Sequence, residues 1–137
     1  MQVPGPIENL IASKTWRNPG AASLRKFLGL EVGYPDLELF EGLHTMRSVW
    51  SQLDTAGYPD DPNFCMSRQP LPINDQRLEF EQALFVAGAT LPGEDVFVAL
   101  NLQDNNNTLL VFDWREPIPT RWVPQSNLPI LVELLSQ

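Results

Sequence analysis

The chain has 137 residues, of which 43% are hydrophobic, and this suits a single folded domain with a substantial core. Acidic residues outnumber basic ones by 17 to 9, and the net charge of -8 repels phosphate backbones, so no nucleic-acid partner is expected. With one cysteine, no secretory leader pattern and no apolar run near the ~20 residues that span a bilayer, we expect no disulfide, no membrane association and a cytoplasmic location.

The N-terminal part of the chain predicts two short helices. Apolar residues at helical spacing indicate a first helix over about 6–15. Asn18 followed by Pro19 is typical of a helix start, and Gly29 is typical of a helix end, so a second helix is expected between them. Trp16 lies in a polar stretch and is a candidate for an exposed aromatic side chain.

The middle of the chain predicts a strand, a helix and a long loop. Weak alternation of apolar residues indicates a strand over Asp36–Leu43. Thr45 is the expected N-cap of an amphipathic helix. Residues 58–77 are rich in Pro, Asp and Asn and predict a loop, and a loop of this length is often functional or mobile. The buried face of the expected helix holds Met46, Val49, Trp50 and Leu53.

The C-terminal half predicts the centre of a sheet. A strand is expected over 78–87, followed by a turn. Asp95–Trp114 then contains two β-rich runs joined by the cluster Asp104–Asn107, which is typical of an antiparallel hairpin. Both faces of this hairpin are apolar, so both are expected to pack. A short edge strand at 121–123 and a last helix capped by Ser126 complete the order.

This order of elements lacks regular βαβ alternation and indicates the α+β class. We expect one domain over residues 1–137, with a small antiparallel sheet around the hairpin and with N-terminal, middle and C-terminal helices beside it. The last helix has Pro129 in its first turn, where proline is tolerated. It is expected to bury a leucine stripe formed by Leu128, Leu131, Leu134 and Leu135.

Several segments follow a known family pattern in the same order. LELFEGL at Leu37–Leu43, with the TMRSVWSQL that follows, corresponds to its first part, and ALFVAG, EDVFVALNL, NTLLVFDW and NLPILVELL correspond to its second. Over about residues 24–135 the chain thus resembles the SMI1/KNR4 superfamily, also called SUKH. Family members usually have an Asn-Gly-Gly segment where this chain has LRKFLGLEVGYPD.

The resemblance implies a protein-binding module and implies no reaction. Bacterial members of the family are mostly immunity proteins that neutralise toxins, and other members are regulatory or assembly adaptors. We therefore expect binding and neutralising or regulating a protein partner. The alternative is an assembly factor that captures a peptide tail of a larger complex, such as an enzyme or microcompartment shell, for which an exposed sheet edge would serve by strand addition.

The sequence contains no pattern typical of a catalytic or metal site. His44 is the only histidine and Cys65 the only cysteine, so a zinc site is not expected, and a surface histidine and a loop cysteine are favoured over a nucleophilic pair. Asp104–Asn107 lacks the spaced ligands of a calcium loop. We expect no catalytic residue, no cofactor and no bound metal, with a small carboxylate-dependent enzyme as the least favoured alternative.

Two sets of residues are candidates for partner contacts. The first is acidic and would steer a basic partner if its members line one sheet face, since alternating residues of a strand share a face: Glu38, Glu41, Glu79 and Glu81. The second flanks a connection with two prolines and has the residue types that dominate binding hot spots: Trp114, Arg115, Arg121 and Trp122. Core packing is the alternative for both tryptophans.

Overall fold

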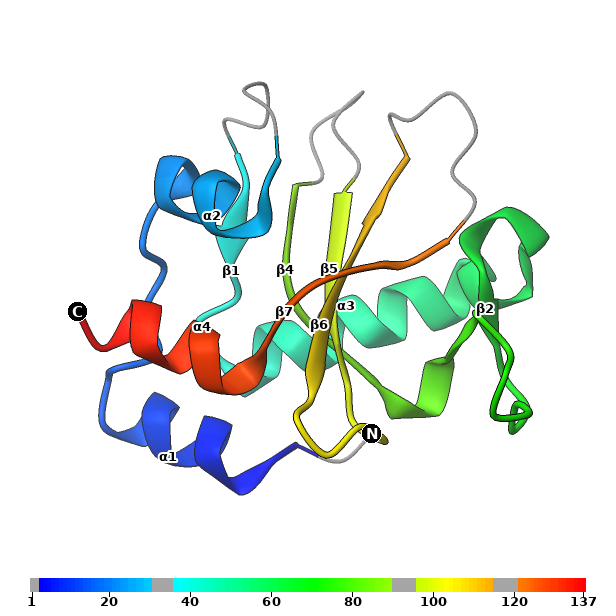
Figure 1. Cartoon of the computed structure of the whole chain (residues 1–137), viewed down its shortest axis with the longest axis horizontal. Coiled ribbons are helices and arrows are strands. Elements are labelled where there is room, and N and C mark those ends of the chain that lie inside the picture. The colour runs from blue at the N-terminus through cyan, green and yellow to red at the C-terminus, as the bar shows by residue number, and fades with distance from the viewer. Residues whose placement is uncertain (1–2, 31–35, 90–95, 115–120) are drawn as a thin grey trace.

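The computed structural model of the chain describes residues 3–30, 36–89, 96–114 and 121–137. In these residues it contains four α-helices and a five-stranded antiparallel sheet, which confirms the predicted α+β class (Figure 1). The helices are α1 (Gly5–Ala12), α2 (Ala21–Leu28), α3 (Leu43–Thr55) and α4 (Leu128–Leu135). None of the described helices is long and apolar enough to cross a membrane.

The main sheet has the strand order β1-β4-β5-β6-β7, and each neighbouring pair is antiparallel. Its strands are β1 (Glu38–Leu39), β4 (Ala83–Ala89), β5 (Val96–Asn101), β6 (Thr108–Asp113) and β7 (Val123–Asn127). Strands β5 and β6 form the predicted hairpin and lie at the centre of the sheet. In its turn, the Asp104 side chain accepts a hydrogen bond from the Asn106 amide at 2.9 Å, and Asn107 has a φ of 49°, which suits an Asx residue.

The two faces of the main sheet differ in chemistry. On one face, aliphatic side chains such as Val98 and Leu109 line a small void together with Leu24 of α2 and Leu131 of α4. On the other face, Phe97 pairs with Phe112 across β5 and β6, and further aromatic rings pack on them. Helices α2 and α4 lie in front of the sheet in Figure 1 and α3 lies behind it. Both faces of the hairpin are therefore covered, as its apolar alternation predicts.

The loop predicted over 58–77 contains short elements in its first half, whereas residues 68–77 form no helix or strand. It contains two short 3-10 helices and a strand: η1 (Tyr58–Asp60), η2 (Pro62–Phe64) and β2 (Met66–Ser67). The strand predicted over 78–87 is divided, because β3 (Leu78–Glu79) is followed by a 3-10 turn, η3 (Phe80–Gln82), before β4 begins. Strand β3 pairs with β2 in parallel and belongs to a separate two-stranded sheet.

The segment between α1 and α2 departs from the expectations in two ways. Trp16 is not exposed; its side chain is 2% exposed and its Nε1 donates to the carbonyl of Phe40 at 2.8 Å. Asn18 does not cap α2, whose N-cap is Gly20 with a φ of 100°. The Asn18 side chain instead accepts a hydrogen bond from the Leu39 amide at 3.2 Å, so it is engaged with β1.

Two other helix starts also differ from the prediction. Helix α3 begins two residues before Thr45 and has Gly42 as its N-cap, without a side-chain hydrogen bond. Helix α4 is capped by Asn127, whose side chain accepts from the Ile130 amide at 3.0 Å. Ser126 does not act as the cap because α4 begins at Leu128, which makes Asn127 the residue at the cap position. The strand expected over Asp36–Leu43 is shortened to β1, since the chain turns into α3 directly after it.

Helix α4 supplies the first test of this packing. Leu131 is 1% exposed and lies against the aliphatic face of the sheet, so Leu131→Ala should lower the free energy of unfolding by ~2–5 kcal/mol. The neighbouring Ile130 is 47% exposed, and Ile130→Ala in the same helix is the matched control, with an expected change within ~0.5 kcal/mol. Urea unfolding measures both, and an unchanged midpoint for Leu131→Ala would show that α4 is not docked.

Candidate functional site

The described residues do not bring together a catalytic or metal-binding group. No cluster of three or more His, Cys, Asp or Glu side chains suited to a metal ion is found among them. Burial raises the pKa of the Cys65 thiol, with a smaller opposing effect from Arg77, whereas an activated nucleophile needs a lowered pKa. His44 lies exposed in the first turn of α3, whereas Cys65 follows η2, beyond the other end of that helix. The absence of a bound metal stays a prediction.

A hollow of about 490 Å³ lies where the N-terminal segment, η3 and the β5–β6 turn meet. Among its lining groups, the Asn107 side-chain amide donates to the carbonyls of Asn101 and Asp104, so it is occupied within the turn. Among the described residues that line it, Glu81 is the only one with an ionisable side chain, so they include no pair of groups for acid–base work. Its lining residues are Val3, Pro4, Gly5, Glu81, Gln82, Leu102 and Asn107.

The four acidic residues of the first candidate surface do not share one sheet. Glu38 lies in β1 of the main sheet, whereas Glu79 lies in β3 of the two-stranded sheet. Glu81 is in η3, so it does not alternate with Glu79 along one strand, and the expectation of a shared face is wrong. Glu41 is exposed and accepts a hydrogen bond from the Asn18 amide at 2.7 Å. Partner binding by these four residues stays a prediction, but without the common sheet that motivated it.

Of the second candidate surface, which comprises Trp114, Arg115, Arg121 and Trp122, one residue belongs to the buried core. Trp122 is 2% exposed, and its Nε1 donates to the carbonyl of Phe64 at 3.0 Å. Trp114 is half-buried and stacks on Phe64, with ring centroids 5.8 Å apart and an interplanar angle of 13°. Arg121 is exposed, whereas Arg115 lies outside the described residues. Core packing therefore accounts for Trp122, and Trp114 and Arg121 remain available at the surface.

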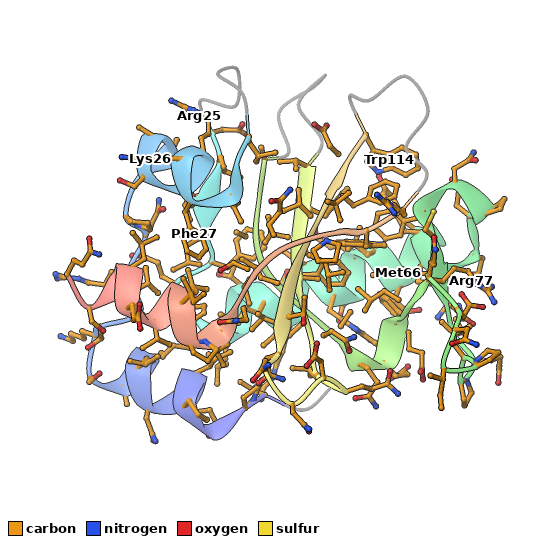
Figure 2. All side chains as sticks on the ribbon, in the orientation of Figure 1. Arg25, Lys26, Phe27, Met66, Arg77 and Trp114 are labelled. Atoms are coloured by element: carbon orange, nitrogen blue, oxygen red, sulfur yellow. The ribbon has the colours of Figure 1, made fainter. Side chains whose placement is uncertain are left out.

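Phe64 lies at the centre of the aromatic face. Figure 2 shows Trp114 at the end of β6, directed toward the segment that precedes β2. Phe64 is fully buried and contacts five rings, from η1, β5, β6, the residue after β6 and the residue before β7: Tyr58, Phe97, Phe112, Trp114 and Trp122. These contacts hold the 58–66 segment against the sheet.

Two arginines form ion pairs in the segment between α3 and β3. Arg68 bridges the end of α3 and η1, with contacts of 2.5 Å to Asp54 and 2.8 Å to Asp60. Arg77 contacts both carboxylate oxygens of Asp75, and this hydrogen-bonded guanidinium lowers the pKa of Asp75 to about 2. The periodicity of the sequence gave no indication of these pairs, because both arginines lie in an irregular, proline-rich segment.

The two edges of the main sheet are exposed to different extents. At the β1 edge, the amide of Leu39 donates to Asn18 and the carbonyl of Phe40 accepts from Trp16, so the segment before α2 covers it. At the β7 edge, no described segment other than β6 hydrogen-bonds to the backbone of β7. The side chains of Val123 and Pro124 are exposed there. Among the described residues, β7 is therefore the open edge of the sheet.

The sequence predicted an edge strand at 121–123, and the observed strand is later and longer. Pro124 lies within β7, and proline in a sheet is confined largely to edges because it has no amide donor. Pro124 lay outside the predicted strand and is the signal that could have placed this edge correctly. Val123 is 37% exposed and Ile130, in the first turn of α4, is 47% exposed, so exposed apolar side chains lie at the start of the strand and beyond its end.

Comparison with protein-family models, with curated proteins and with solved structures finds no significant match to this chain.

The hydrogen bond from Trp122 to Phe64 is expected to be important for stability. Trp122→Phe removes the donor and leaves a buried carbonyl unpaired, so the free energy of unfolding should fall by at least ~1–3 kcal/mol. Trp114→Phe is the control, because Trp114 is half-buried and the contacts it makes with described residues are ring contacts. Thermal unfolding of the two variants compares them, and an equal loss in both would contradict a specific role for the hydrogen bond.

The Asp75–Arg77 pair makes a pH-dependent prediction. Because the pKa of Asp75 is lowered in the folded state, its contribution to stability is present above pH ~4, where the unfolded carboxyl is also ionised, and is lost as the pH falls toward 2. Asp75→Asn should therefore be less stable than the parent chain at pH 7, and the difference should disappear near pH 2. Urea unfolding at several pH values tests this, and a difference that does not vary with pH would contradict it.

Proposed function

We propose that this chain is a non-enzymatic protein-binding module of the SMI1/KNR4 type that binds an extended segment of a partner protein along β7. The open edge of β7 is the observation that supports this proposal, since extended peptides bind by adding a strand to an exposed sheet edge. The described order of α2, β1, α3, the strands and α4 also agrees with the order that the family resemblance implies.

Backbone pairing alone would give such a complex only a few hydrogen bonds. Pro124 provides an acceptor but no donor, and the register of β7 against β6 shifts between Ser126 and Pro124. Side-chain contacts must therefore supply part of the affinity and most of the specificity. Val123 and Ile130 are exposed apolar side chains in position to do so, because they lie at the start of β7 and just beyond its end.

Of the two roles that the resemblance implies, this geometry favours an adaptor or assembly factor that captures a peptide tail. A neutralising, immunity-type role is the second candidate, and the net charge of -8 favours it because it attracts basic proteins. Both roles require a protein partner and no reaction. The single cysteine agrees with placing this activity in a reducing cytoplasm.

The proposal predicts that the exposed apolar side chains near β7 contribute to binding and that an equally exposed isoleucine elsewhere does not. The partner is first identified by affinity purification with the parent chain and then tested as a purified protein by calorimetry. Ile130→Glu and Val123→Glu should each weaken binding by about fivefold or more, which corresponds to ~1 kcal/mol. Ile73→Glu is the matched control, because Ile73 is fully exposed in the connection between β2 and β3.

The same titrations distinguish the other surfaces. Glu38→Lys with Glu79→Lys tests the acidic candidates, and Trp114→Ala with Arg115→Ala tests the tryptophan-rich connection. If binding is unaffected by the β7 variants but is lost in one of these pairs, then the partner uses that surface and the β7 proposal is wrong.

A further inference from the structure

The hollow beside the start of α1 is a second place where this chain could hold a ligand. Its volume of about 490 Å³ lies within the ~300–1,000 Å³ range of small-molecule sites. Figure 1 shows the start of α1 close to the β5–β6 turn, and η3 closes the remaining side of the hollow. None of the lining residues belongs to β7, so this hollow is separate from the open edge of the sheet.

Backbone hydrogen bonds hold each wall of the hollow in place. The Leu102 amide donates to the carbonyl of Gln82 at 2.8 Å, which joins the end of β5 to η3. The Asn107 amide donates to the carbonyl of Asp104 at 3.0 Å and closes the β5–β6 turn. The Pro4 carbonyl accepts from the first turn of α1. A ligand would therefore meet a surface that is already ordered, and such preorganisation favours binding.

The groups that line the hollow suit a cation with an apolar stem. Glu81 is exposed and, within the described part of the chain, forms no ion pair or side-chain hydrogen bond. The Asn107 side-chain nitrogen is used within the turn, which leaves its side-chain oxygen as an acceptor for a ligand. The apolar lining comes from Val3, Pro4 and Leu102, and no lining residue is basic.

The start of α1 is the one feature of the hollow that would favour an anion instead. Pro6 has no amide, and the amides of Ile7 and Glu8 both bond to the Pro4 carbonyl, so Gly5 has the remaining amide of this first turn. A helix end carries a partial charge of only ~0.5. The full negative charge of Glu81 is larger, and the net charge of -8 adds to it, so the hollow favours a cation.

We propose that this hollow binds an organic cation, namely a guanidinium or ammonium group on a short apolar stem. A bare divalent metal ion fits less well, because Ca²⁺ takes about 6–8 oxygen ligands and the described lining residues include a single carboxylate. An organic cation needs fewer oxygens, and its stem would bury apolar surface against Val3, Pro4 and Leu102. The cation can be an Arg or Lys side chain of a protein partner or a free amine or guanidine.

NMR titration of the intact, isotope-labelled chain tests this site with three probes. They are butylguanidinium, the tripeptide acetyl-Gly-Arg-Gly-amide, and the same tripeptide with neutral citrulline in place of arginine. Both cations should shift the amide signals of Glu81, Leu102 and Asn107, and should bind more weakly as salt is added. The citrulline peptide should bind more weakly than the arginine peptide at every salt concentration.

Two variants with equal net charge separate a specific site from general attraction. Glu81→Gln should weaken binding of both cations by about two- to fivefold, as expected for one exposed ion pair. Glu79→Gln is the matched control, because Glu79 lies in β3 and does not line the hollow, and binding should be unchanged. Tighter binding of the arginine peptide assigns the site to a side chain of a protein partner, and equal or tighter binding of butylguanidinium assigns it to a free cation.

The proposal is overturned if neither cation shifts these three signals, if the citrulline peptide binds as tightly as the arginine peptide, or if both variants weaken binding equally. None of these outcomes depends on strand addition at β7, so the two sites are tested independently.

Discussion

Phe64 reaches the aromatic face of the sheet from a segment with little regular structure of its own. The residue ends a single 3-10 turn and is followed by Cys65 at a φ of 57°, a conformation that costs a non-glycine residue ~1 kcal/mol or more. Five ring contacts and the hydrogen bond that the Phe64 carbonyl accepts from Trp122 offset this cost. Because Trp122 is held by the same contact, the position of Phe64 also determines where β7 begins.

Strand β7 is therefore held at both ends and exposed between them. At its start, Trp122 is buried in the aromatic face; at its end, Asn127 caps α4, and Leu131 docks on the aliphatic face. The strand thus joins structures that pack on opposite faces of the sheet. A strand fixed in this way loses little conformational freedom when another segment pairs with it, and preorganisation of this kind favours binding. The open edge is exposed without being loosely held.

The sequence was sufficient for those features that depend on local periodicity. The alternation in the hairpin and the leucine stripe of α4 located the centre of the sheet and the helix that covers it. The sequence did not predict contacts that join residues distant from each other along the chain. Trp16 lies in a polar stretch, yet its indole binds the carbonyl of Phe40, and no local pattern reports such a partner.

In the candidate site, too, local sequence patterns predicted some features and missed those that depend on tertiary packing. Alternation of Glu79 and Glu81 predicted a shared strand face, but Phe80 between them is fully buried within a 3-10 turn that interrupts the strand. Pro124 was a signal that the prediction of an edge strand over 121–123 did not use, although the missing amide donor is a property of the residue itself. The packing of α2 against β1 was not predictable, since it depends on how both elements are placed in the fold.

An open edge also exposes a protein to pairing with its own copies, and natural sheets usually protect their edges. Here β1 is covered by Asn18, whereas β7 has one proline and a shift in register. Two copies paired edge to edge about a twofold axis would present the same strand to each other, so Pro124 of each copy would lie in the shared ladder without an amide to donate. The proline and the register shift therefore disfavour regular pairing of β7 with a second copy of the chain.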